Sequence, residues 1–167
     1  MISFSNLYST PKNPHKFMSH VEKVKTVLSD IEAVKAACTR LGVEFRENQK
    51  TYEYFGRHVG DYPLPEGFSA NDLGKCEHAV HVPGTNYEIG LAKNPAGKGY
   101  TALYDFYGSS TRHDGQNLLK KFGHGLTKFV DAYSVEALKR QARAKGYLTS
   151  EKTLANGNTQ LTVTGFA

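Results

Sequence analysis

The chain has little cysteine, no tryptophan and no long apolar run, and these absences exclude several classes of protein. Its 167 residues include only two cysteines, Cys38 and Cys76, too few for the disulfide framework of a small secreted domain. No window approaches the roughly 18 unbroken apolar residues of a membrane-spanning helix. No positively charged apolar leader opens the chain,. We therefore expect a soluble, cytoplasmic protein that has no contact with membranes.

Repeats and low-complexity tracts are also absent, and the length is that of one domain,. The formal charge of +5 and the pI near 9.1 favour an acidic partner or a polyanion at long range,. A lysine-rich solvated surface explains an excess of this size more simply than a nucleic-acid face does.

The first residues and the rest of the chain differ in character. Residues Met1–Phe17 contain Pro11 and Pro14, which neither a helix interior nor a central strand accepts. The sequence therefore predicts an N-terminal arm over residues 1–17 and a single domain over 18–167.

The domain begins with a strand and a capped helix. His20–Leu28 is interpreted as the first strand. Ser29 with Glu32 makes a capping box for a helix that carries apolar residues at helical spacing and ends before Gly42,. Cys38 falls on the apolar stripe of this helix, so we expect it in the core.

The middle of the chain predicts strands around one long loop. Two short runs, 43–45 and 51–55, suggest an interrupted strand. Gly56–Gly74 contains three glycines and two prolines before Gly74 and shows no periodicity, so we interpret it as a loop insertion on the surface, suited to binding. Cys76–Val82 alternates, and Tyr87–Leu91 with Tyr100–Phe106 predicts a hairpin.

The C-terminal part begins with a helical pattern that Gly123 and Gly125 interrupt. From Leu126 an amphipathic helix follows and ends at Gly146, and its predicted apolar stripe is Phe129, Val130, Tyr133, Ala137 and Leu138,. Asn156-Gly157 between two short strands predicts a type I′ hairpin.

This order of elements predicts an α+β fold. It is an antiparallel sheet with two main helices on one face and a C-terminal β-hairpin, an order compatible with a ferredoxin-like arrangement. An open sheet also has edges that a second copy can cover. The sequence leaves the oligomeric state undecided.

Several short runs resemble one known family. They are Met18-Ser-His-Val-Glu-Lys-Val-Lys-Thr, Tyr87-Glu-Ile-Gly-Leu, Lys128-Phe-Val-Asp-Ala-Tyr-Ser and Lys145-Gly-Tyr with the final hairpin. Together they are similar to the hypothetical chloroplast frame thirty-five family, a domain-of-unknown-function family of plastids, cyanobacteria and phages. A tryptophan-bearing segment of that family is absent, and residues 1–17 precede its usual start, which makes Met18 an alternative initiator.

The resemblance implies a fold and a context, since the family has no established activity. It implies an accessory protein, with phage as one source. The neighbourhood of AAA-type ATPase genes implies an AAA-type ATPase as a partner.

One metal-site candidate is the run Cys76-x-His78-x-x-His81, three potential ligands within six residues,. In a regular strand Cys76 and His78 share one face while His81 points to the other. A half-buried strand with surface histidines is therefore the simpler interpretation, and we assign no cofactor.

An anion-site candidate is the polar connection Gly108–Gly115, where Arg112 and His113 precede a helix. The spacing is not that of a P-loop. The alternative is a helix cap, in which Asp114 or a hydroxyl satisfies the first helical amides.

Basic side chains along the last helices suggest a nucleic-acid interface. We assign anion or nucleic-acid binding to Arg112, His113, Lys120, Lys121, Lys128, Arg140 and Arg143. Lysines on helices normally face water, however, and no aromatic signature of an RNA-recognition domain is present.

No catalytic constellation or Gly-x-Ser-x-Gly elbow is found,. We therefore hypothesise a non-enzymatic accessory or adaptor protein that acts through protein contacts. The alternative is a weak single-stranded nucleic-acid-binding protein that uses a basic helix face.

Overall fold

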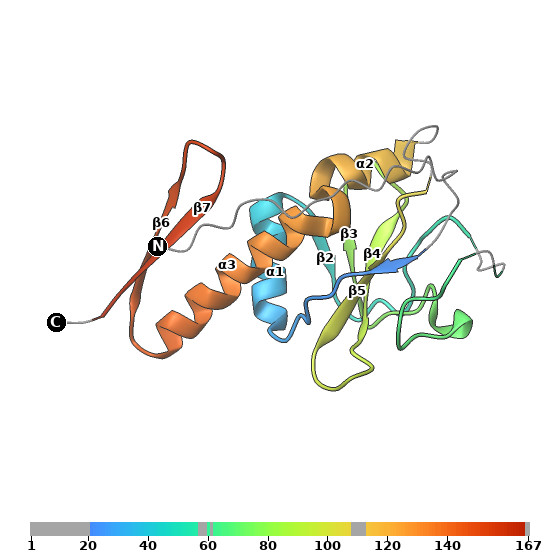
Figure 1. The fold of residues 1–167 in the computed structure, drawn as a ribbon, viewed down its shortest axis with the longest axis horizontal. Coiled ribbons are helices and arrows are strands. Elements are labelled where there is room, and N and C mark those ends of the chain that lie inside the picture. The colour runs from blue at the N-terminus through green and yellow to red at the C-terminus, as the bar shows by residue number, and fades with distance from the viewer. Residues whose placement is uncertain (1–20, 57–59, 61, 108–112, 166–167) are drawn as a thin grey trace.

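A five-stranded antiparallel sheet forms the centre of the protein (Figure 1). The computed structural model describes residues 21–56, 60, 62–107 and 113–165. The predicted N-terminal arm, Met1–Phe17, lies outside them. The sheet has the order β1-β5-β4-β3-β2. Its strands are β1 (Glu22–Lys23), β2 (Glu44–Arg46), β3 (His78–His81), β4 (Glu88–Lys93) and β5 (Tyr100–Tyr104).

Three helices and a separate hairpin complete the fold. The helices are α1 (Ile31–Leu41), α2 (His113–Phe122) and α3 (Thr127–Ala144), with single 3-10 turns at Ala70–Asp72 (η1) and His124–Leu126 (η2). The hairpin is β6 (Leu148–Thr153) with β7 (Thr159–Thr164). The predicted α+β class and the C-terminal β-hairpin are confirmed.

The strand order departs from the ferredoxin-like arrangement. That arrangement has two strands between its helices and returns to the sheet with its last strand. Here four strands, β2 to β5, separate α1 from α2, and the last two strands form a second sheet. Strands β2 to β5 therefore form an antiparallel meander, and β1 adds to it as an edge strand beside β5.

The helices cover one face of the sheet, as the sequence predicts. One core cluster joins Val34 of α1, Leu118 of α2 and Phe129 of α3 to Val80 and Ile89 of the sheet. These side chains are fully buried. The apolar spacing that predicted α1 and the first part of α3 thus also predicted buried residues such as Cys38, Phe129 and Tyr133.

The opposite face of the sheet is covered by the chain between Gln49 and Cys76. Leu73 is buried there with Tyr52, and Leu64 and Phe68 pack against the same cluster. A methyl group on Gly90 of β4 would lie 2.1 Å from the Tyr52 ring, so only glycine lets that ring cross the strand. Most described residues of Gly56–Gly74 are exposed, but Leu64, Phe68 and Leu73 of this stretch pack on the sheet. The loop insertion stays a prediction.

The start of α1 differs in detail from the prediction. Its N-cap is Asp30, whose carboxylate accepts hydrogen bonds from the amides of Glu32 and Ala33. The predicted cap, Ser29, instead donates its amide to the Tyr133 hydroxyl on α3, at 2.9 Å. Gly42 ends the helix in the left-handed conformation, as predicted.

The four residues Gly123-His124-Gly125-Leu126 separate α2 from α3. Gly123 has φ 74° and Gly125 has φ 64°, which confirms the predicted interruption. Leu126 follows with φ 54° and is fully buried. A non-glycine residue seldom adopts this conformation, so burial of the Leu126 side chain holds the backbone of the turn.

The hairpin turn is also corrected. Gly157 has φ 83°, whereas Asn156 is not among the residues with positive φ, and a type I′ turn needs both. The Gly157 amide donates to Leu154 O, and the Leu154 amide donates to Asn158 O. This is a three-residue loop in which glycine takes the left-handed position.

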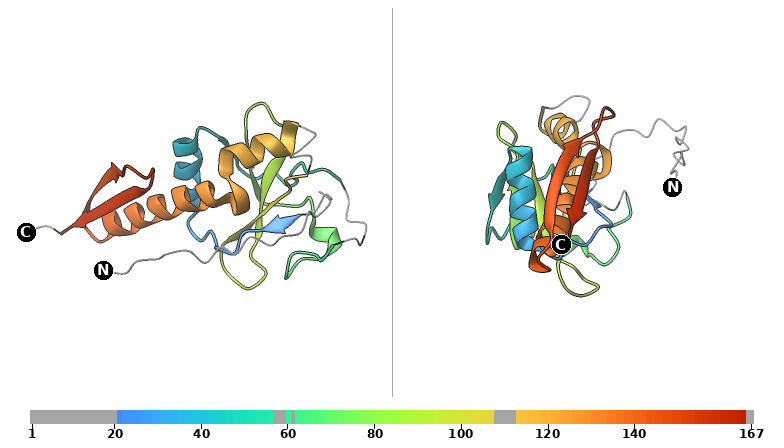
Figure 2. Two further views of the ribbon diagram at one scale, coloured as in Figure 1. Left: turned by 45° about the horizontal axis from the view of Figure 1, so that its top comes forward. Right: turned by 90° about the vertical axis from the view of Figure 1, so that its left-hand side faces the viewer.

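The end of α3 and the hairpin reach away from the sheet (Figures 1 and 2). We call residues 138–165 the projection. Most of its strand residues are exposed. Leu138, predicted on the buried stripe of α3, is 53% exposed, so that expectation is wrong. No helix in the described part of the chain is long and apolar enough to cross a membrane.

Candidate functional site

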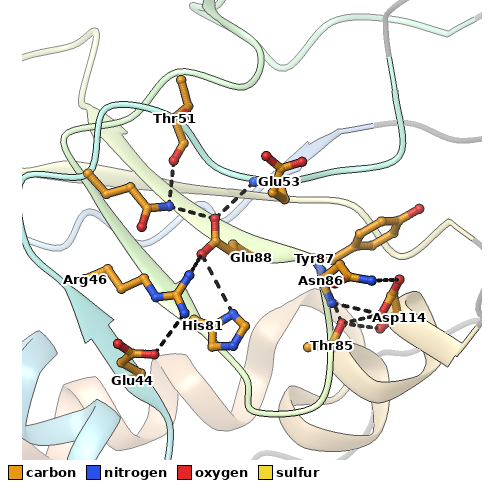
Figure 3. Close-up of polar contacts among 11 residues, drawn as sticks. Glu44, Arg46, Thr51, Glu53, His81, Thr85, Asn86, Tyr87, Glu88 and Asp114 are labelled. Atoms are coloured by element: carbon orange, nitrogen blue, oxygen red, sulfur yellow. Dashed lines mark hydrogen bonds and ion pairs between the residues drawn. The ribbon is translucent and has the colours of Figure 1, made fainter.

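Glu88 is a buried carboxylate at the start of β4, beside the β2 end of the sheet. Its Oε1 accepts a hydrogen bond from Arg46 at 2.6 Å. Its Oε2 accepts from Gln49 Nε2 at 2.7 Å and from the Glu53 amide at 3.1 Å. Figure 3 shows these donors converging on Glu88 from β2 and from the chain that follows it.

A hollow of about 460 Å³ lies against this carboxylate. It is lined by Arg46, Gln49, Thr51, Glu53, His81, Thr85, Asn86 and Glu88. His81 places Nδ1 3.8 Å from Glu88 Oε1. That nitrogen is buried and has no hydrogen-bond partner among the described residues.

The geometry around Glu88 favours a structural role. Both oxygens already accept hydrogen bonds, and 3.8 Å to His81 exceeds the reach of a proton transfer. Arg46 also bonds Glu44, so its guanidinium is shared between two carboxylates. The cluster fastens residues 46–53 to the sheet, because all of its donors come from that segment.

A second carboxylate, Asp114, fixes the start of α2. Its Oδ1 accepts hydrogen bonds from Thr85 Oγ1 at 3.0 Å and from the Asn86 amide at 2.9 Å. Asp114 therefore ties the first turn of α2 to the β3–β4 connection (Figure 3). Of the predicted anion site, Arg112 lies outside the described residues, and His113 is the first residue of α2.

The two cysteines are buried, as expected for Cys38. The Cys76 thiol donates to Gln49 O at 3.1 Å. Burial raises the pKa of both thiols to about 12. A raised pKa disfavours the thiolate, so neither side chain is an activated nucleophile.

The three metal candidates do not converge. Cys76 belongs to the cluster under the 49–76 chain, because a bend at Glu77 breaks the strand alternation. His78 accepts from the Asn48 amide at Nδ1 and lies 3.2 Å from the Tyr100 hydroxyl at Nε2. His81 lies beside Glu88. Within the described ranges, no three Cys, His, Asp or Glu side chains are grouped to hold a metal.

The cations assigned to nucleic acid divide between two ends of α3. Lys120, Lys121 and Lys128 lie near the α2–α3 turn, where the Lys128 ammonium reaches Lys120 O at 3.4 Å. Arg140 pairs with Asp30 at 2.8 Å and so helps to cap α1. Arg143 lies about 22 Å beyond Lys128 on a straight helix. The nucleic-acid hypothesis stays a prediction.

A groove of about 770 Å³ runs between α3 and the hairpin. Its apolar lining comes from Leu41, Ala132, Val135, Leu138 and Leu161. Further out, Leu148 and Val163 are 58% and 48% exposed. The projection therefore combines a groove with apolar side chains in contact with water.

A small ion-pair cluster holds the hairpin beside α3. Glu151 of β6 pairs with Arg40 of α1 and with Lys139 of α3, the latter at 2.8 Å. Glu136 of α3 binds the same two cations, at 3.0 and 3.1 Å. These contacts explain the basic residues Arg40 and Lys139 structurally.

Neither a protein-family model, nor a curated protein, nor a solved structure is found to match this chain. The resemblance described above therefore stays a prediction.

The sequence analysis missed both the Glu88 cluster and the projection. A charge at the start of the buried run Glu88–Ala92 was the signal for the first. The signal for the projection was the absence of charge in the six-residue strand Thr159–Thr164. A second signal was the apolar residue Leu138 near the end of the preceding helix, which is exposed.

Proposed function

We propose that the protein is a non-enzymatic accessory or adaptor protein that acts through protein contacts, with the projection as its binding surface. The observation that carries the proposal is the exposure of both faces of the β6–β7 hairpin. A two-stranded hairpin is marginally stable in water on its own. Binding of another protein to the exposed hairpin would bury its side chains and stabilise it.

The exposed apolar side chains of the projection support the proposal. Leu138 at the end of α3 lines the groove, and Leu148 and Val163 of the hairpin are exposed further out on the same projection. Apolar surface gathered in this way is typical of interaction sites. We call residues 21–137 the body. It buries most of its large apolar side chains, and its carboxylate Glu88 is tied to neighbouring donors.

Cytoplasmic localisation, or the host cytoplasm for a phage-encoded chain, belongs to the same proposal. The low cysteine content supports it,. An AAA-type ATPase is a partner for which the family resemblance is the only support.

Co-purification from the native host, with mass spectrometry of the retained proteins, tests the proposal. We expect a specific partner with the native chain and its loss with the double variant Leu138→Glu, Val163→Glu. The matched control is Val27→Glu, which places the same charge at a 40% exposed valine of the body. Retention of the partner by the double variant, or failure to retain any partner under mild conditions, would contradict the proposal.

A further inference from the structure

The outer edge of β7 is an unprotected strand edge. The described residues form four such edges, at β1, β2, β6 and β7. Three are blunted: β1 has only two residues, both charged, β2 carries Glu44 and Arg46, and β6 carries Glu151 and Lys152. Natural proteins protect free edges by short length or by charge. The six residues of β7, Thr159–Thr164, have neither protection.

The backbone of β7 offers a regular row of donors and acceptors. The hydrogen bond from the Leu154 amide to Asn158 O makes this a bonded pair of the ladder. Bonded and non-bonded pairs alternate in an antiparallel ladder, so Gln160 and Thr162 bond β6. The amides and carbonyls of Thr159, Leu161 and Val163 therefore point to the free edge.

The side chains of these three residues make the edge self-complementary. They share one face of the hairpin, the face on which Leu161 lines the groove beside α3,. In a two-fold symmetric antiparallel pair, residues of this face oppose residues of the same face. Leu161 and Val163 would then meet one another or Thr159 of a second copy, without any like charges brought together.

We propose that the projection pairs with a second copy of this chain, β7 against β7, to give a four-stranded sheet β6-β7-β7-β6. This pairing rests on the proposed function, because it takes the projection as a binding surface and names a second copy of the chain as what binds there. A second copy is the partner that the uncharged β7 edge favours, because two such edges can pair without bringing like charges together. It also turns a marginal two-stranded ribbon into a sheet of a more stable size.

Sedimentation equilibrium of the purified full chain tests this pairing over a range of concentrations. We expect twice the 18.5 kDa mass of the chain at the higher concentrations. Thr159→Pro removes an edge-facing amide while leaving the β6–β7 ladder intact. We expect this variant to associate at least tenfold more weakly.

The matched control is Thr153→Pro. Thr153 lies opposite Thr159 in the hairpin, and its amide faces the other edge, that of β6. We expect this variant to dimerise like the native chain. A monomer at all concentrations, a dimer unchanged by Thr159→Pro, or equal weakening by both substitutions would each overturn the pairing.

The two proposals fail separately. A monomeric chain that retains a host partner through Leu138 and Val163 would overturn the pairing alone. A dimer sensitive to Thr159→Pro that retains no host partner would overturn the adaptor function and leave the pairing intact.

Discussion

The body and the projection of this protein use the same kinds of residue in opposite ways. In the body, both faces of the sheet are covered, one by three helices and the other by the chain from Gln49 to Cys76. In the projection, both faces of a hairpin are largely exposed, and a few ion pairs hold it beside α3. We therefore expect buried contacts of the body to supply most of the free energy of unfolding, while the projection is available for contacts with other molecules.

The largest test of this comparison replaces one apolar side chain in each region. Phe129 is fully buried and packs edge-on against Phe122, so Phe129→Ala should lower the free energy of unfolding by about 3–5 kcal/mol. Leu148→Ala, at a 58% exposed position, should change it by less than about 0.5 kcal/mol. Urea denaturation of both variants at low protein concentration measures the two values. Equal losses would contradict the division.

A buried and an exposed ion pair, both within the body, provide the next test. Arg46→Met should cost about 1–3 kcal/mol, because it removes a donor from the buried Glu88 carboxylate,. The matched control is Lys93→Met, which breaks the pair with Glu77 at a 78% exposed lysine and should cost less than about 1 kcal/mol. Chemical denaturation again reports both. A neutral Arg46→Met would show that Glu88 keeps enough donors from Gln49 and Glu53.

These buried contacts also show where prediction from sequence succeeds and fails. Gly42, Gly123 and Gly146 were predicted as helix ends, because left-handed backbone is a local property of glycine,. The N-cap was predicted one residue too early. Ser29 with Glu32 fits the capping box, but Asp30 is also a favoured N-cap residue, and the Ser29 amide bonds Tyr133, far away in sequence,. Local chemistry is thus readable, whereas the choice between local alternatives depends on tertiary contacts.

The candidate site was largely unpredictable for the same reason. The donors to Glu88 come from residues 35–42 positions earlier in the chain. Leu64, Phe68 and Leu73 follow no helical or strand period, so their burial under the sheet left no pattern. The bend at Glu77 also reverses the expected face of Cys76. Helical or strand periodicity in the sequence cannot predict these contacts, because they join residues far apart in the chain.

A third test uses pH and concerns the body alone. Burial lowers the pKa of His78 below its usual 6.5, so the unfolded chain binds a proton there more readily than the folded chain. Stability should therefore fall as pH drops below about 6.5, until the folded-state pKa is passed. His78→Gln should flatten this slope in thermal melts between pH 7 and 5. His124→Gln, at an exposed histidine of η2, is the control, and an equal effect of both would refute the assignment.

The smallest expected effect concerns the attachment of the projection. Lys139 and Arg40 lower the pKa of Glu151, and Glu151→Gln removes both ion pairs. The free energy of unfolding should change by less than about 1 kcal/mol, because these contacts are partly solvated. Hydrogen exchange of β6 and β7 amides should nevertheless accelerate, while that of β4 and β5 stays unchanged. Unchanged exchange in the hairpin would mean that other contacts hold it.

The left-handed turn at Leu126 has a mechanical consequence. The 18 residues of α3 start directly after it and extend about 27 Å at the rise of an α-helix. A rotation of about 10° at this turn would displace the far end of α3 by about 5 Å on that length. A change in packing around Leu126 would therefore change the orientation of α3. The hairpin would move with it, although none of its own residues is altered.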